Sequence, residues 1–206
     1  MDLNEYFEKV LTFSSQEEFS SEIIQAKIEY FNRMGKVNET DPSYEMRMNQ
    51  FLEWYVFRRP LNSYGNPPVR LYYERFAKNM SDQEAEVYRG FLNSIHSLFQ
   101  VKKVEKDGLF VKDLFTDRRY SVECDVPGGF PRNLLFEGRI IPVGDRFWFS
   151  NAFCFHPEEA QKFILTELKK LRKEELEDIT PFLQRLSVLK LKYDRYKKAD
   201  AKQFYK

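Results

Sequence analysis

The side chains best suited to chemistry in this sequence lie near position 155. Cys154 and His156 are separated by one residue, and residues two apart on a β-strand lie on the same face. The thiol and the imidazole could therefore act as a nucleophile with its base, or supply half of a zinc site. Cys124 and His96 are the remaining Cys and His of the chain and would complete a set of four ligands.

The spacing of these four residues argues against both kinds of site. Zinc ligands usually come in closely spaced pairs such as C-x-x-C, whereas Cys124 lies 28 residues after His96 and 30 residues before Cys154. No Asp or Asn stands out as the third member of a catalytic set. We therefore expect Cys154 to pack as a small apolar residue and His156 to lie beside a helix start. The sequence leads us to assign no catalytic residue, no metal and no cofactor.

Arginines in the middle of the chain are candidates for binding phosphate or nucleic acid. Arg118 and Arg119 are adjacent, and guanidinium groups suit bidentate phosphate recognition. However, residues 99–156 hold nine Lys plus Arg against eight Asp plus Glu, a net charge of only +1, which is no electrostatic footprint for nucleic acid. Basic residues of the last segment join the same candidate set: Lys190, Lys197 and Lys198.

The last segment of the chain is strongly basic, whereas the first segment is acidic. Residues 181–206 carry eight Lys plus Arg against two Asp plus Glu, a net of +6, while residues 1–60 have a net of −4. Apolar residues recur there at steps of four and three, as in a short coiled-coil stripe: Phe182, Leu186, Leu189, Tyr193 and Tyr196. The stripe predicts binding to a protein partner or a second copy, or docking on the acidic front of the same chain. RNA and anionic lipid are alternatives.

Helical spacing dominates the first half of the chain. Ser15 to Glu18 and Ser81 to Glu84 each fit a capping box, in which Ser and Glu satisfy each other's backbone donors at a helix start. Gly35 is a plausible helix end, and Asp41 with the following proline should restart a helix. The helix that opens at Ser81 is expected to reach about His96.

Short apolar runs replace this pattern after Phe99. Turn signals separate them, and Asp107-Gly108 is the clearest hairpin turn. About five strands in roughly 55 residues predict a small antiparallel β-meander or an SH3- or OB-like barrel. The fold class is therefore α+β, with a helical region over 1–98, a barrel or bent sheet over 99–156, and C-terminal helices with the basic tail over 157–206. These three parts could form one compact unit.

The composition excludes several classes of protein. The 206 residues include 17% aromatics and 32% charged residues, so most of the chain should fold. Two cysteines are too few for a disulfide framework. The acidic start does not fit a signal peptide, and no apolar run is long enough to span a membrane. We expect a cytoplasmic protein with no transmembrane segment.

Several short motifs resemble a loose group of uncharacterised bacterial proteins. The group carries a "FLEWF"-type helix, a helix-to-strand junction and a "VPVGDxW" turn in a small β-barrel. The matching segments here are Phe51 to Phe57, Ser97 to Val101 and Pro142 to Trp148. The resemblance covers roughly residues 48–155 and implies one helix-plus-barrel unit. It implies no known activity. Some members carry a cysteine-rich metal-binding tail that this chain lacks.

Three functions remain open at this point. The absence of catalytic motifs and the surplus of aromatics favour a non-catalytic interaction module that binds a protein partner or self-associates. A nucleic-acid or nucleotide binder using the barrel and the basic C-terminal helix is the first alternative, and it predicts a contiguous basic surface. An enzyme of unknown type, relying on Asp, Glu or Tyr for proton transfer, is the second.

Overall fold

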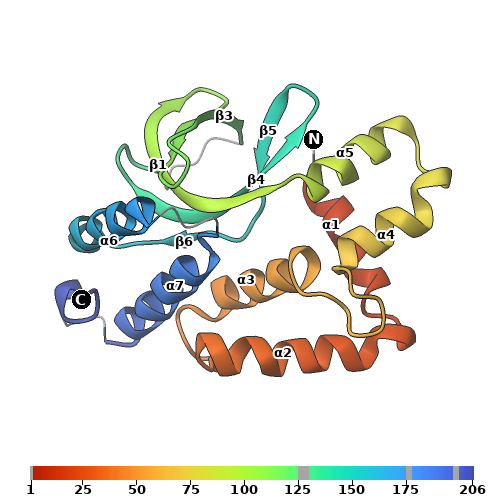
Figure 1. Cartoon of the computed structure of the whole chain (residues 1–206), viewed down its shortest axis with the longest axis horizontal. Helices are drawn as coiled ribbons and strands as arrows, with labels where there is room; N and C mark the ends of the chain where they lie inside the picture. Colours follow the sequence, from red (N-terminus) through yellow and green to blue (C-terminus); the bar gives the residue numbers. More distant parts are fainter. Residues whose placement is uncertain (1, 125–129, 175–177, 197–199) are drawn as a thin grey trace.

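A computed structural model describes residues 2–124, 130–174, 178–196 and 200–206. Helices form the front of the chain, a small β-barrel follows, and further helices pack beside the barrel (Figure 1). The α+β class expected from the sequence is confirmed. In the described residues, no helix has the length and apolar character needed to cross a membrane.

The front of the chain is a layer of five α-helices with two short 3-10 turns. Their bounds are α1 Leu3–Phe13, η1 Glu17–Phe19, α2 Ser20–Met34, α3 Tyr44–Phe57, α4 Pro68–Phe76, η2 Ala77–Asn79 and α5 Asp82–Leu92. The Ser81 capping box is present, with both reciprocal hydrogen bonds to Glu84. The end of α2 at Gly35 is also as expected, and its φ of 91° is one that glycine tolerates.

Two other helix starts differ from expectation. Ser15 does not cap α2, because its hydroxyl donates to the Leu11 carbonyl of the preceding helix at 2.7 Å. The η1 turn therefore intervenes before α2 begins. Asp41 does not cap α3 either, because its carboxylate accepts from the Asn38 backbone N–H at 2.9 Å.

The middle of the chain is a closed barrel with an additional short strand. Its strands are β1 Ile95–Glu105, β2 Gly108–Asp113, β3 Arg119–Glu123, β4 Leu135–Val143, β5 Arg146–Phe149 and β6 Cys154–Phe155. The order is β1-β2-β3-β5-β4-β6, and β1 also pairs with β4, which closes the five-stranded ring. The turn at Asp107 and Gly108 joins β1 to β2, as the sequence predicts.

The barrel is not a simple antiparallel meander. β4 inserts between β1 and β5, so β5 reaches β3 from the other side and pairs with it in parallel. Of the architectures considered from the sequence, this Greek-key order is the OB-like one. His96 is also not at a helix end: α5 stops at Leu92, and Ile95 already pairs with Ile140 of β4, which places His96 within β1.

The apolar side chains form three clusters, and β4 contributes to each. Phe136 and Ile140 point into the barrel, whereas odd-numbered positions face the helices. Leu135 packs with the C-terminal helices, and Ile141 packs with the N-terminal layer. Because both faces of β4 are covered, the strand is almost entirely buried.

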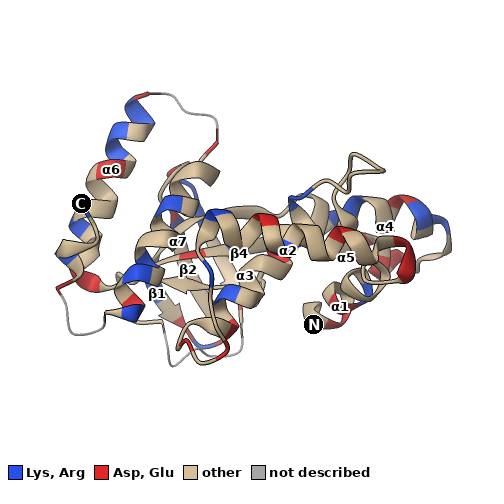
Figure 2. Ribbon diagram, turned by 90° about the horizontal axis from the view of Figure 1, so that it is seen from below, with Lys and Arg blue, Asp and Glu red and all other residues tan. Residues whose placement is uncertain are grey.

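The chain ends with helices that pack beside the barrel and the N-terminal layer: η3 Glu158–Ala160, α6 Gln161–Lys173, α7 Thr180–Arg195 and η4 Ala201–Gln203. Lys and Arg recur along α6 (Figure 2). The fully buried Arg47 of α3 holds α7 in place. Its guanidinium donates to the Ser187 hydroxyl at 2.5 Å and to the Met34 carbonyl at 2.6 Å. Arg195 pairs with Asp41 at 3.2 Å, so the basic helix docks on the acidic front of its own chain.

The contact between α5 and β4 provides a test of this packing. A Cβ atom on Gly90 would lie 2.0 Å from the Pro142 carbonyl oxygen, which is backbone and cannot move aside cheaply. Gly90→Ala is expected to lower the free energy of unfolding by about 1–3 kcal/mol, despite the better helix propensity of Ala. Urea denaturation measures the loss. Glu86→Ala on the same helix is the control, and equal stability of the two variants would contradict the predicted contact.

Candidate metal centre

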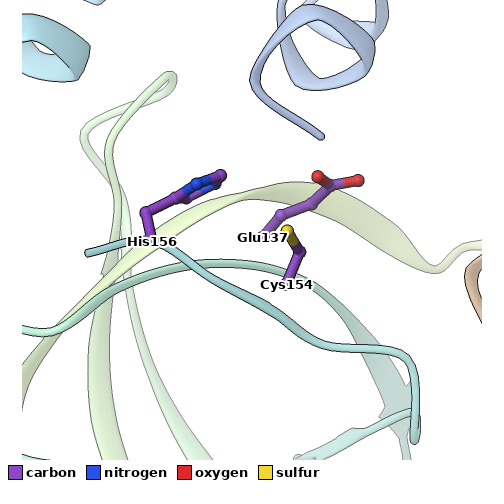
Figure 3. Close-up of side chains that lie close together, drawn as sticks. All are labelled: Glu137, Cys154 and His156. Atoms are coloured by element: carbon purple, nitrogen blue, oxygen red, sulfur yellow. The ribbon is translucent and has the colours of Figure 1, made fainter. Parts of the chain in front are cut away.

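Three potential ligands lie on one face of two neighbouring strands. Glu137 of β4 and Cys154 of β6 are directly opposite each other in the antiparallel register. His156 follows Cys154 by two residues, and its backbone N–H donates to the Leu135 carbonyl at 3.1 Å, which continues the pairing beyond β6. A directly opposed pair and a residue two positions on share one face of a sheet. The three side chains therefore extend to the same side, as Figure 3 shows.

These three side chains are close together and shielded from solvent. One ligand atom from each lies within 4.8 Å of the other two. The exposed fractions are 7% for Glu137, 0% for Cys154 and 2% for His156. A buried carboxylate, thiol and imidazole in one place are costly unless their polar atoms find partners.

Glu137 and His156 each have one side-chain atom in a hydrogen bond and one side-chain atom without a partner among the described residues. His96 Nε2 lies 3.0 Å from Glu137 Oε1, and the Tyr205 hydroxyl lies 3.2 Å from His156 Nδ1. The other two atoms, Glu137 Oε2 and His156 Nε2, are buried without a hydrogen-bond partner among the described residues. When Nδ1 donates its proton to Tyr205, the lone pair of Nε2 is free to bind a metal ion.

The pKa shifts argue against thiol catalysis. Burial, with a smaller contribution from the Glu137 charge, raises the pKa of the Cys154 thiol to about 12. Burial lowers the pKa of His156 to about 4. The thiol is thus protonated at neutral pH, and within the described part of the chain His156 Nε2 makes no hydrogen bond through which to activate it. A neutral imidazole is, by contrast, ready to bind a metal ion.

The arrangement has the features of a metal site with its supporting residues. Thiolate, imidazole and carboxylate are the donors that zinc prefers. Metal-binding His and carboxylate groups are commonly oriented by a hydrogen bond on their second atom. His96 and Tyr205 stand in those supporting positions for Glu137 and His156.

A buried ion pair lies next along β4. Arg139 Nε donates to Glu53 Oε2 of α3 at 3.1 Å, and the side chains are 4% and 10% exposed. The guanidinium also lies over the Phe57 ring at 4.3 Å. A small cavity of about 40 Å³ is lined by this pair, by Glu137 and by His96. The pair and the candidate metal centre are therefore adjacent but separate groups.

The four Cys and His candidates from the sequence do not all come together. Cys154 and His156 are in the group, and His96 supports it through Glu137. Cys124 lies at the end of β3 among the residues that line a separate cleft, outside the group.

The basic candidates lie in different surroundings from one another. Arg118 and Arg119 are exposed where the chain enters β3. Lys190 is largely buried and pairs with Asp194 at 2.5 Å. Lys197 and Lys198 lie outside the described residues.

The predicted stripe on the last helix is mostly occupied within the chain. Phe182 and Leu186 are buried in the C-terminal cluster, and Leu189 and Tyr193 pack against it. Tyr196 is 63% exposed, although its ring stacks on Phe204. Of the alternatives open at the sequence level, the structure has the helix packed against its own chain.

Sequence reasoning missed Glu137 and Tyr205. One signal for Glu137 was present: Glu137 and Arg139 interrupt an otherwise apolar run on a strand with both faces covered. Charged residues at such positions need partners. No signal in the sequence pointed to Tyr205.

A double-mutant cycle can test the buried ion pair between Arg139 and Glu53. Arg139→Met leaves Glu53 buried without its partner, and Glu53→Leu does the same to Arg139. Each single change is expected to cost about 3 kcal/mol of unfolding free energy, and the double variant less than the sum. Urea unfolding of the four proteins measures the coupling. Strict additivity would show that the two side chains do not interact.

The comparisons with known proteins give a family but no function. No curated protein and no solved structure matches the chain. A family model described as a family of unknown function (DUF7986) matches residues 12–200. This agrees with the uncharacterised group expected from the sequence, although the quoted motifs themselves are not tested. The match spans most of the chain, which therefore belongs to this family of unknown function.

Proposed function

We propose that this chain is a zinc-binding, non-catalytic module whose ligands are Glu137, Cys154 and His156. One observation carries the proposal: Glu137, Cys154 and His156 each offer a ligand atom within 4.8 Å of the other two, and among the described residues two of their buried atoms, Glu137 Oε2 and His156 Nε2, have no hydrogen-bond partner. Leaving such atoms unpaired costs about 1–3 kcal/mol each. A bound cation would satisfy both at once.

The donor set favours zinc over other common metal ions. Mg²⁺ and Ca²⁺ prefer oxygen ligands and avoid thiolates, whereas zinc accepts sulfur, nitrogen and oxygen together. The metal would displace the Cys154 proton, because a coordinating thiol is deprotonated despite its raised pKa. The resulting thiolate and carboxylate would balance the charge of the ion.

Burial supports a structural role for the metal. The three ligands are nearly inaccessible, so substrate could not reach the fourth coordination position, which a water molecule would fill. The supporting residue Tyr205 comes from the last segment of the chain, whereas Glu137 comes from the barrel. A metal here would link β4 to the chain leaving β6, and the hydrogen bond from Tyr205 would tie the C-terminal segment to one of its ligands.

Metal content and thermal stability test the proposal. Protein purified without chelator is expected to bind one zinc ion per chain, as measured by native mass spectrometry. Excess zinc should raise the melting temperature, by the equivalent of about 2.7 kcal/mol at a hundredfold excess over Kd. Cys154→Ala should lose both effects, and Cys124→Ala should retain both. With cobalt in place of zinc, sulfur-to-metal absorption should appear only when Cys154 is present.

A second variant separates a metal role from simple packing. Tyr205→Phe keeps the ring and removes the hydroxyl that holds His156 Nδ1. Its zinc affinity is expected to fall by about 10–100-fold while the metal-free protein remains folded. Equal zinc binding by wild type and Cys154→Ala, or no zinc binding by either, would refute the proposal.

Binding of a protein partner, which the sequence favours, is a second candidate function. Ile24 and Ile28 of α2 are 61% and 58% exposed and lie one helical turn apart. Such a pair on a helix surface suits association with a second copy of the chain through α2.

Sedimentation velocity tests self-association through α2. The wild type is expected to form dimers at high concentration, whereas Ile24→Ser with Ile28→Ser should stay monomeric. Leu165→Ser changes another exposed apolar residue, on α6, and should leave association unchanged. A monomeric wild type at all concentrations would remove this candidate.

A further inference from the structure

A cleft of about 770 Å³ lies between the N-terminal helices and the barrel, apart from the candidate metal centre. It is lined by α1 and α3 on one side, and by β5 and the segment leading to β6 on the other. Asn151 of that segment donates to Asn4 of α1 at 3.3 Å, which links the two sides. The volume is within the range of about 300–1,000 Å³ that small-molecule sites occupy.

Aromatic and aliphatic side chains supply much of the cleft lining. Phe7 comes from α1, Leu52 from α3, and Trp148 and Phe149 from β5. All four are only partly buried, so part of each side chain remains open to a ligand. The faces of Trp and Phe rings carry negative potential and attract cations, Trp most strongly.

The charged side chains of the lining are mainly acidic. Among the described residues of the lining, five carboxylates stand against one lysine: Asp2, Glu8, Glu53, Asp107 and Glu123, with Lys106. Two of the five are already paired, Glu53 with Arg139 and Glu123 with Arg146. The other three still exceed the single lysine. A concave site with one sign of charge concentrates ions of the opposite sign.

We propose that this cleft binds a small organic cation with an apolar body. The rings would contact the apolar part and the positive charge, and the carboxylates, above all Glu8, would neutralise that charge. The same carboxylates would repel phosphate, so the cleft does not suit a nucleotide or nucleic acid. The proposal is independent of the zinc site, because none of the three zinc ligands lines the cleft.

The two tryptophans of the chain give a direct readout. Trp148 lines the cleft and Trp54 does not, so Trp54→Phe leaves a single reporter in the site. Phenethylammonium is expected to change the Trp148 fluorescence in a saturable way. 2-Phenylethanol, its neutral analogue, should bind about tenfold more weakly. Isothermal titration of the wild type repeats the comparison without any substitution.

Matched charge variants on α1 identify the contact. Glu8 lines the cleft and Glu5 does not, although both are exposed on the same helix. Glu8→Gln should weaken phenethylammonium binding roughly threefold, as expected for a partly screened charge, and Glu5→Gln should leave it unchanged. Trp148→Leu should abolish binding.

Three results would overturn the proposal. They are equal affinity for phenethylammonium and 2-phenylethanol, equal effects of Glu8→Gln and Glu5→Gln, and no binding of either probe at millimolar concentration. Cys154→Ala should still bind the cation. That measurement keeps the outcome for the cleft separate from the outcome for zinc.

Discussion

The placement of two charged residues on β4 constrains most of the structure. β4 is covered on both faces, yet Glu137 and Arg139 lie on the face toward the helices. Neither charge can reach bulk water, so each must find partners on other elements. Arg139 forms an ion pair with Glu53 of α3, and this pair joins the N-terminal layer to the barrel. The Glu137 carboxylate pairs with His96 of β1 and lies beside Cys154 and His156.

The candidate zinc site and the cleft are two results of the same arrangement. The segment between β5 and β6 leaves β5 and returns to pair with β4 at Cys154. Its outer part lines the cleft, and its end delivers the thiol and the imidazole to Glu137. Ala152 of this segment and Glu53 border both the cleft and the small cavity beside Glu137. One short connection thus contributes both to the buried group around Glu137 and to the aromatic and acidic cleft.

Some features set by neighbouring residues could be predicted from the sequence, although the Ser15 and Asp41 caps could not, and features set by distant pairing escaped prediction. The turn at Asp107-Gly108 and the Ser81 capping box depend on a few adjacent residues, and both are present. The parallel pairing of β3 with β5 depends on where β4 inserts, which no local pattern encodes. The candidate site needs the register that sets Glu137 opposite Cys154, 17 positions later in the chain. Without that register, the spacing of Cys and His alone pointed away from a metal.

The bonds from Arg47 to Ser187 join residues 140 positions apart in the sequence. Closing so long a loop is entropically costly, which favours formation of the helical layer and the barrel before α7 docks. Until then the Arg47 charge is hydrated, and local departure of α7 would hydrate it again. This lowers the cost of opening α7 relative to any strand of the barrel. Because Leu183 and Gln184 of α7 border the cavity beside Glu137, that opening would give an ion a route to and from its ligands without global unfolding.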